Sequence, residues 1–94
     1  MSFDIDLYVD SSYNGFWPPE VIEDYFQEYH SKATELARNI DWDEIILYAI
    51  YCFDEETEAL ISADFMLLRM DYCRYCKFAE KIAPGCRLFF VRNQ

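Results

Sequence analysis

Glycine and histidine are scarce in this sequence, which has 2 glycines, 3 prolines and 1 histidine among its 94 residues. Loops that cradle phosphate groups need several glycines at fixed spacing, and neither GxGxxG nor GxxxxGKS/T occurs. His30 is a lone histidine, which is weak evidence for acid–base catalysis, so we interpret it as an ordinary, partly exposed side chain. We therefore expect that this protein is not an enzyme.

Long apolar segments are also missing. The longest uninterrupted run is Ile45 to Phe53, whereas a helix that crosses a membrane needs about 20 apolar residues. The start of the chain, Met1 to Asp4, is acidic at once and lacks the basic segment of a signal peptide. We expect a cytoplasmic protein without a membrane partner, whose four cysteines are thiols.

Basic residues are few. The chain has 8 basic and 18 acidic residues, which gives a net charge of −10. Residues 1–64 carry a net charge of −14, and residues 65–94 carry +4. Such a field repels nucleic acids and anionic membranes over most of the surface, and it attracts basic partners. The charge therefore favours a protein partner over direct binding of nucleic acid.

Apolar and aromatic residues are abundant: 53% of the residues are hydrophobic and 19% are aromatic. Buried aromatic rings remove roughly 150–250 Å² each from water, which makes a dense core feasible in a small chain. The length fits one domain, residues 1–94.

The order of hydrophobic patterns along the chain predicts six elements. Alternation predicts a strand at Phe3 to Val9, followed by a turn at Asp10 to Gly15. After Pro18-Pro19, apolar residues recur at spacings of three and four residues. This pattern predicts an amphipathic helix of about five turns that reaches Ile40. The remaining elements are a buried strand, a returning strand, a second helix and a final strand, at residues 45–53, 58–65, 66–82 and 87–91.

This β-α-β-β-α-β order predicts an α+β protein of the ferredoxin-like kind, with two helices on one face of a four-stranded antiparallel sheet. The alternative is a mostly α-helical small domain in which residues 55–82 form one or two helices.

The cysteines allow a metal site as an alternative reading. Cys73 and Cys76 form a CxxC motif, and Cys52 and Cys86 are the remaining ligands that a tetrahedral zinc site would need. The motif falls inside the predicted second helix, not at its N-terminus where thiols become reactive. We interpret these cysteines as small core residues and expect no cofactor. Residues 41–44 lack the alternating oxygen ligands of a calcium loop.

The acidic clusters are the strongest functional signal. Four acids on the first helix span eight residue steps, about 12 Å, which resembles the charge spacing of one DNA strand. Tyr13, Phe16 and Trp17 lie outside the helical stripe, and we expect them to add exposed aromatic contacts. The predicted partner-binding acids are Glu20, Glu23, Asp24, Glu28, Asp41, Asp43, Glu44, Asp54, Glu55, Glu56 and Glu58.

These observations lead to the hypothesis of a small acidic inhibitor or adaptor that docks on a basic groove of a nucleic-acid-handling protein and imitates phosphate charge. In composition alone the chain is similar to phage-encoded inhibitors of host defence, such as anti-CRISPR and anti-restriction proteins. A Cys₄ zinc module and a structural or assembly subunit, including a homodimer, are the alternatives. A further reading uses the basic C-terminal part for single-stranded nucleic acid, with aromatic residues interleaved between Arg69, Arg74, Lys77, Lys81, Arg87 and Arg92.

Overall fold

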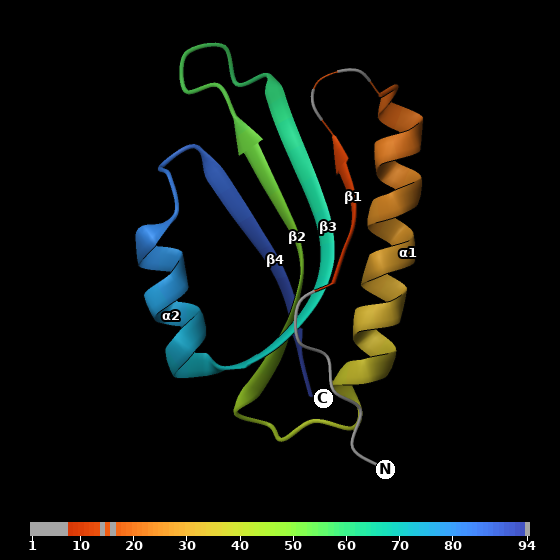
Figure 1. Cartoon of the computed structure of the whole chain (residues 1–94), viewed down its shortest axis with the longest axis vertical. Coiled ribbons are helices and arrows are strands. Elements are labelled where there is room, and N and C mark those ends of the chain that lie inside the picture. Colours follow the sequence, from red (N-terminus) through yellow and green to blue (C-terminus); the bar gives the residue numbers. More distant parts are fainter. Residues whose placement is uncertain (1–7, 14, 16, 94) are drawn as a thin grey trace.

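The computed structural model describes residues 8–13, 15 and 17–93. Its elements are β1 (Tyr8–Tyr13), α1 (Pro19–Ala37), β2 (Glu44–Phe53), β3 (Leu60–Asp71), α2 (Tyr72–Lys81) and β4 (Cys86–Arg92), as Figure 1 shows. The predicted α+β class is confirmed.

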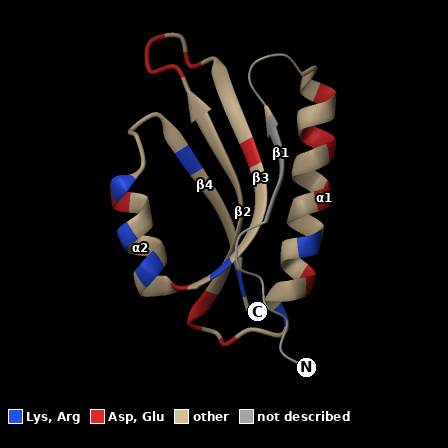
Figure 2. Ribbon diagram, viewed as in Figure 1, with Lys and Arg blue, Asp and Glu red and all other residues tan. Residues whose placement is uncertain are grey.

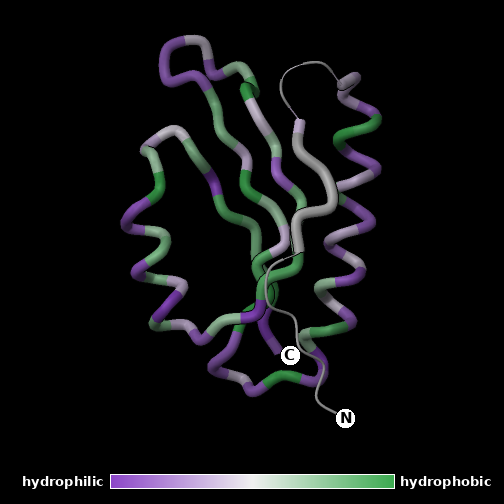
Figure 3. Tube along the Cα trace, viewed as in Figure 1, coloured by the Kyte–Doolittle hydropathy of each residue, from purple (hydrophilic) through white to green (hydrophobic). Residues whose placement is uncertain are grey.

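The strands form one antiparallel sheet in the order β1-β3-β2-β4. The long strands β2 and β3 are therefore central, and β1 and β4 are the edges. Ile45, Ile46 and Leu47 in β2 have no exposed surface, because this stretch is covered on both faces of the sheet. Figure 3 shows the hydrophobic colour gathered along these central strands. The prediction of a buried strand at residues 45–53 is confirmed.

The two helices cover opposite faces of the sheet. Adjacent residues of a strand point to opposite faces. The ring of Phe89 in β4 lies 5.0 Å from that of Phe26 in α1, whereas the ring of Phe90 lies 4.6 Å from that of Tyr75 in α2. Figure 1 shows α1 and α2 on the two sides of the strands. The ferredoxin-like prediction of both helices on one face is therefore wrong.

The strand order explains this arrangement. Because β3 lies between β1 and β2, and β2 lies between β3 and β4, each helix connects two parallel strands across an intervening one. Such crossovers are right-handed in nearly all proteins. Both crossovers step in the same direction across the sheet, toward β4, but they start from strands that run in opposite directions. Right-handed connections then place α1 and α2 on opposite faces.

The second predicted helix began too early. Met66 to Asp71 continue β3, pairing with β2 so that Met70 lies opposite Ile45. Long-range pairing overrides the helical propensity of this leucine- and methionine-rich stretch. The helix begins at Tyr72, where the Asp71 carboxylate caps it by accepting a hydrogen bond from the backbone N–H of Arg74 at 2.8 Å.

The N-terminal prediction is only partly tested. Most of the strand predicted at Phe3 to Val9 lies outside the described residues, as does Asn14 of the predicted turn. The prediction of a turn is wrong for residues 10–13, because β1 continues to Tyr13. This strand pairs with β3, and the register of the pairing shifts between Val9 and Ser11. Gly15, at φ 80°, adopts the left-handed conformation that a turn uses.

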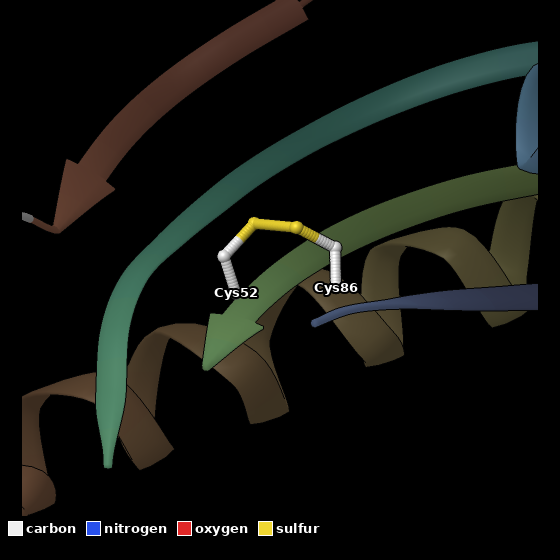
Figure 4. The surroundings of a disulfide bond; sticks show 2 residues. All are labelled: Cys52 and Cys86. Atoms are coloured by element: carbon white, nitrogen blue, oxygen red, sulfur yellow. A yellow bond between two sulfur atoms is a disulfide. The ribbon is translucent and has the colours of Figure 1, made fainter. Parts of the chain in front are cut away.

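A disulfide bond joins Cys52 in β2 to Cys86 in β4 (Figure 4). The two residues are direct partners in the β2–β4 pairing, and their Cα atoms are 4.0 Å apart. The expectation that all four cysteines are thiols is therefore wrong for this pair. Cys73 and Cys76 are free, but Cys73 is exposed and Cys76 is only half-buried, so the interpretation as core residues is wrong for Cys73. The bond closes a sequence separation of 34 residues and fixes the edge strand β4 to the centre of the sheet.

Removing this crosslink should destabilise the fold. We expect the double substitution of Cys52→Ala and Cys86→Ala to lower the free energy of unfolding by about 3 kcal/mol, because the unfolded chain regains loop entropy. Urea unfolding of both proteins measures the difference. Cys73→Ala, at an exposed free cysteine, is the matched control and should change the stability little. Equal stability of the double variant and the wild type would contradict this role.

Candidate functional site

A groove lies between the N-terminal half of α1 and the sheet. Its volume is about 640 Å³, within the range of about 300–1,000 Å³ that is common for ligand sites. Its lining comes from four strands, one helix and the loop before that helix: Tyr13, Trp17, Pro19, Ile22, Glu23, Phe26, Gln27, Tyr51, Leu60 and Phe89. We call this hollow the aromatic groove.

Aromatic rings packed against one another line this groove. The ring of Tyr51 contacts those of Phe89 and Phe26 edge-on, with centroids 4.8 and 5.7 Å away. Trp17 stacks on Tyr25 at 5.1 Å, and Tyr13 lies 6.0 Å from Trp17. Such contacts hold the rings in defined orientations. The lining is therefore fixed before any ligand arrives.

The polar groups of the groove are few. Glu23 and Gln27 line it from α1, and Tyr51 contributes a phenol from β2. Burial, and then the neighbouring Tyr48 and the charge of Glu23, raise the pKa of Tyr51 to about 12. Glu23 and Tyr51 both line the groove, so the carboxylate and the phenol face the same hollow. Tyr51 is therefore neutral at physiological pH, and Glu23 is the charged group of the lining.

Two of the three predicted acidic clusters lie at the same end of the molecule as the aromatic groove. Figure 2 shows the acids at the start of α1 and those of the β2–β3 hairpin at the same end of the molecule. Leu60, which lines the groove, follows the hairpin directly. The side chains of both clusters are exposed except for the half-buried Asp54. We call this region the groove end, with the acids Glu20, Glu23, Asp24, Asp54, Glu55, Glu56 and Glu58.

The acidic hairpin is an ordered loop. The Asp54 carboxylate accepts hydrogen bonds from the backbone N–H groups of Glu56 at 2.8 Å and Thr57 at 3.2 Å. These bonds, first that from Thr57 and then that from Glu56, lower the pKa of Asp54. Asp54 thus holds the loop in shape, while Glu55, Glu56 and Glu58 remain exposed.

The third predicted cluster is elsewhere. Asp41 and Asp43 lie between α1 and β2, and Glu44 is the first residue of β2, at the opposite end of the molecule (Figure 2). Glu44 is also bound to Arg69, whose Nε and Nη2 atoms donate to its carboxylate at 2.7 and 3.0 Å. The Arg69 hydrogen bonds are the main reason that the pKa of Glu44 is lowered. The predicted set of partner-binding acids thus contains residues that the fold places at opposite ends of the molecule.

The predicted aromatic contacts have mixed outcomes. Tyr13 is only 8% exposed and Trp17 is half-buried, so neither projects freely into solvent as expected, although both line the groove. Phe16 lies outside the described residues. Sequence reasoning missed Tyr51 and Phe89, since nothing in a run of strand residues shows which ring will face an open groove.

The basic residues of α2 do not neutralise the acids of α1. Because α2 lies on the other face of the sheet, Arg74, Lys77 and Lys81 are separated from the acids of the first helix (Figure 2). The expected neighbourhood of the two helices is therefore wrong. The interleaved aromatic residues also divide, since Phe89 faces α1 and Phe90 faces α2. The basic segment thus offers no single stacking surface made of both rings.

The cysteines do not converge on a metal. Cys52 and Cys86 are bonded to each other, and among the described residues no three histidine, cysteine or acidic side chains gather as ligands. The CxxC motif lies inside α2, as expected, but it begins at the second residue, because that helix starts at Tyr72. The expectation that the motif lies away from the helix N-terminus is therefore wrong. His30 is exposed, and its Nδ1 atom is 2.9 Å from the Tyr48 hydroxyl.

The comparisons with known proteins leave the site to be judged on its own geometry. The chain matches no protein-family model, no curated protein and no solved structure. Within residues 8–13, 15 and 17–93, none of the helices has the length and apolar character to cross a membrane.

The Glu44–Arg69 pair should contribute a small, pH-dependent stabilisation. In a double-mutant cycle with Glu44→Gln and Arg69→Gln, we expect a coupling energy of about 0.5 kcal/mol at pH 7. The pKa of Glu44 in the folded protein is lowered from its ordinary value of 4.5. The coupling is therefore complete above that value and is lost as the pH falls through the lower folded-state pKa. Urea unfolding at pH 7 and pH 3 measures it, and a coupling that grows in acid would refute this assignment.

Proposed function

We propose that this protein is a non-catalytic, acidic inhibitor or adaptor that docks with its groove end on a basic groove of a nucleic-acid-handling protein. The observation that carries the proposal is the arrangement of two acidic segments, distant in sequence, at the same end of the molecule as one aromatic groove (Figure 2). Interfaces of this kind combine charged surroundings with a few buried aromatic anchors.

The charges at the groove end are available to a partner. Among the described residues, no ion pair involves Glu20, Glu23 or Asp24, or the hairpin acids Glu55 and Glu56. Uncompensated charge of one sign raises the rate of encounter with a basic surface and selects among partners. The repulsion between these carboxylates also lowers the stability of the folded protein. A basic partner that pairs with them is the physical reason that we assign to their clustering.

The exposed face of α1 supports an imitation of phosphate charge. Glu20, Asp24 and Glu28 recur every four residues, so they lie one above the other along one face of the helix, about 6 Å apart. Glu28 also forms an ion pair with Lys32 at 3.0 Å, but both side chains are half exposed and such pairs are weak. A row of carboxylates on a rigid helix fits a surface that binds a nucleic-acid backbone. The class of inhibitor that we propose includes inhibitors of host-defence nucleases.

The proposed partner class places the protein in the cytoplasm, or in the host cytoplasm if the protein is viral. The Cys52–Cys86 disulfide is the observation that weighs against this location, because disulfide bonds persist mainly in oxidising compartments.

Two charge variants test the proposal. One removes four charges at the groove end by Glu20→Gln, Asp24→Asn, Glu55→Gln and Glu56→Gln. The control removes the same charge elsewhere by Glu35→Gln, Asp41→Asn, Asp43→Asn and Glu80→Gln. Each protein is immobilised and exposed to the heparin-binding fraction of a cell lysate, which is rich in nucleic-acid-binding proteins. Bound protein is then eluted with a salt gradient and identified by mass spectrometry.

We expect wild type and control to retain the same protein, to release it at moderate salt, and to lose it when duplex DNA is added as a competitor. The groove-end variant should retain it at least tenfold less, since each lost contact with a charged group is worth about 1.5–3 kcal/mol in a desolvated interface. Retention by no protein, equal retention by both variants, or retention that DNA does not reduce would overturn the proposal.

A further inference from the structure

The aromatic groove has the lining of a site for an organic cation. Half of its ten lining residues are aromatic: Tyr13, Trp17, Phe26, Tyr51 and Phe89. The face of an aromatic ring carries partial negative charge, and it attracts a cation that lies within about 6 Å of its centre. Several rings around one hollow add such contributions and leave little room for water.

A single carboxylate gives this lining a net negative charge. Glu23 lines the groove, and in the described part of the chain no ion pair involves it. A purely apolar ligand would cover this carboxylate without pairing it, which costs free energy. A cation with an apolar stem avoids that cost, because its stem contacts the rings while its charge binds Glu23.

Among the side chains of a protein partner, arginine fits best. Its planar guanidinium group stacks on aromatic rings and forms two parallel hydrogen bonds to a carboxylate, whereas the lysine ammonium is a compact, strongly hydrated charge. The same chain already makes such contacts elsewhere: the Arg92 guanidinium carbon lies 4.4 Å from the Tyr72 ring centre, and that of Arg87 lies 4.9 Å from the Phe53 ring centre.

We infer that the aromatic groove binds an arginine side chain of the partner, with its guanidinium group on the Glu23 carboxylate and its stem against Trp17 and Tyr51. This inference rests on the proposed function and names the chemistry of its central contact. The groove volume of about 640 Å³ exceeds that of one side chain, so residues next to the arginine enter as well and contact Ile22 and Leu60.

A single-arginine peptide tests the inference without the partner. The probe is acetyl-Ala-Arg-Ala-amide, and its citrulline analogue has the same shape without the charge. Titration into ¹⁵N-labelled protein follows the indole N–H signal of Trp17, which is assigned by comparison with Trp42→Phe. We expect a saturable shift with a Kd on the order of 1 mM, as befits one side chain, and at least tenfold weaker binding of the citrulline peptide.

Two variants with the same change in net charge show where the cation binds. Glu23→Gln should weaken binding of the arginine peptide about tenfold, whereas Glu35→Gln, on the same helix but outside the groove lining, should leave it unchanged. Spectra of both variants without peptide verify that the fold is intact. The absence of a saturable Trp17 shift, equal binding of the citrulline peptide, or equal binding to Glu23→Gln would overturn the inference.

The outcome is separable from that of the proposed function. If the peptide fails while the groove end still captures a DNA-competed protein from the heparin fraction, the proposed function stands and the arginine contact falls. If the peptide binds as expected and no such protein is captured, the groove is an arginine site and the proposed partner class is wrong.

Discussion

The pairing of β2 with both β3 and β4 is the constraint on which the rest of the molecule depends. In the sheet of the described residues β2 lies between these two neighbours, and its residues Ile45 to Leu47 are covered on both faces. The Cys52–Cys86 bond adds a covalent link to this pairing at the groove end of β2. Once β2 is central, the right-handed crossovers assign α1 to one face and α2 to the other, and the charges follow the helices.

The aromatic groove is a consequence of this arrangement. In the C-terminal half of α1 the inward residues Ala33 and Ala37 are small and have almost no exposed surface. At its N-terminal half the inward residues are larger, and Phe26 meets Tyr51 and Phe89 of the sheet. The space between these rings stays open to solvent, and the acids at the start of α1 and in the hairpin lie at the same end of the molecule (Figure 2). Apolar anchoring and negative charge thus meet at one end.

The sequence carried enough information for the elements that local pattern determines. The Pro18-Pro19 start and the apolar spacing predicted α1, and the run from Ile45 to Phe53 predicted β2. The early start of the second helix failed because pairing with β2 extends β3 to Asp71. The helices were placed on one face because strand order depends on contacts between distant residues, which a single sequence does not show. For the same reason Asp41 and Asp43 were grouped with the acids of α1, although the fold places them at the other end.

Carboxylate labelling tests the central claim, that the groove end is the partner-binding surface, most directly. Carbodiimide-activated coupling of an amine modifies exposed acids, and mass spectrometry compares each of them in the free protein and in the complex with the protein that it captures. The account predicts that Glu20, Glu23, Asp24, Glu55 and Glu56 are protected in the complex, while Asp41, Asp43 and Glu80 react as before. Protection of the second group with unchanged labelling of the first would contradict it.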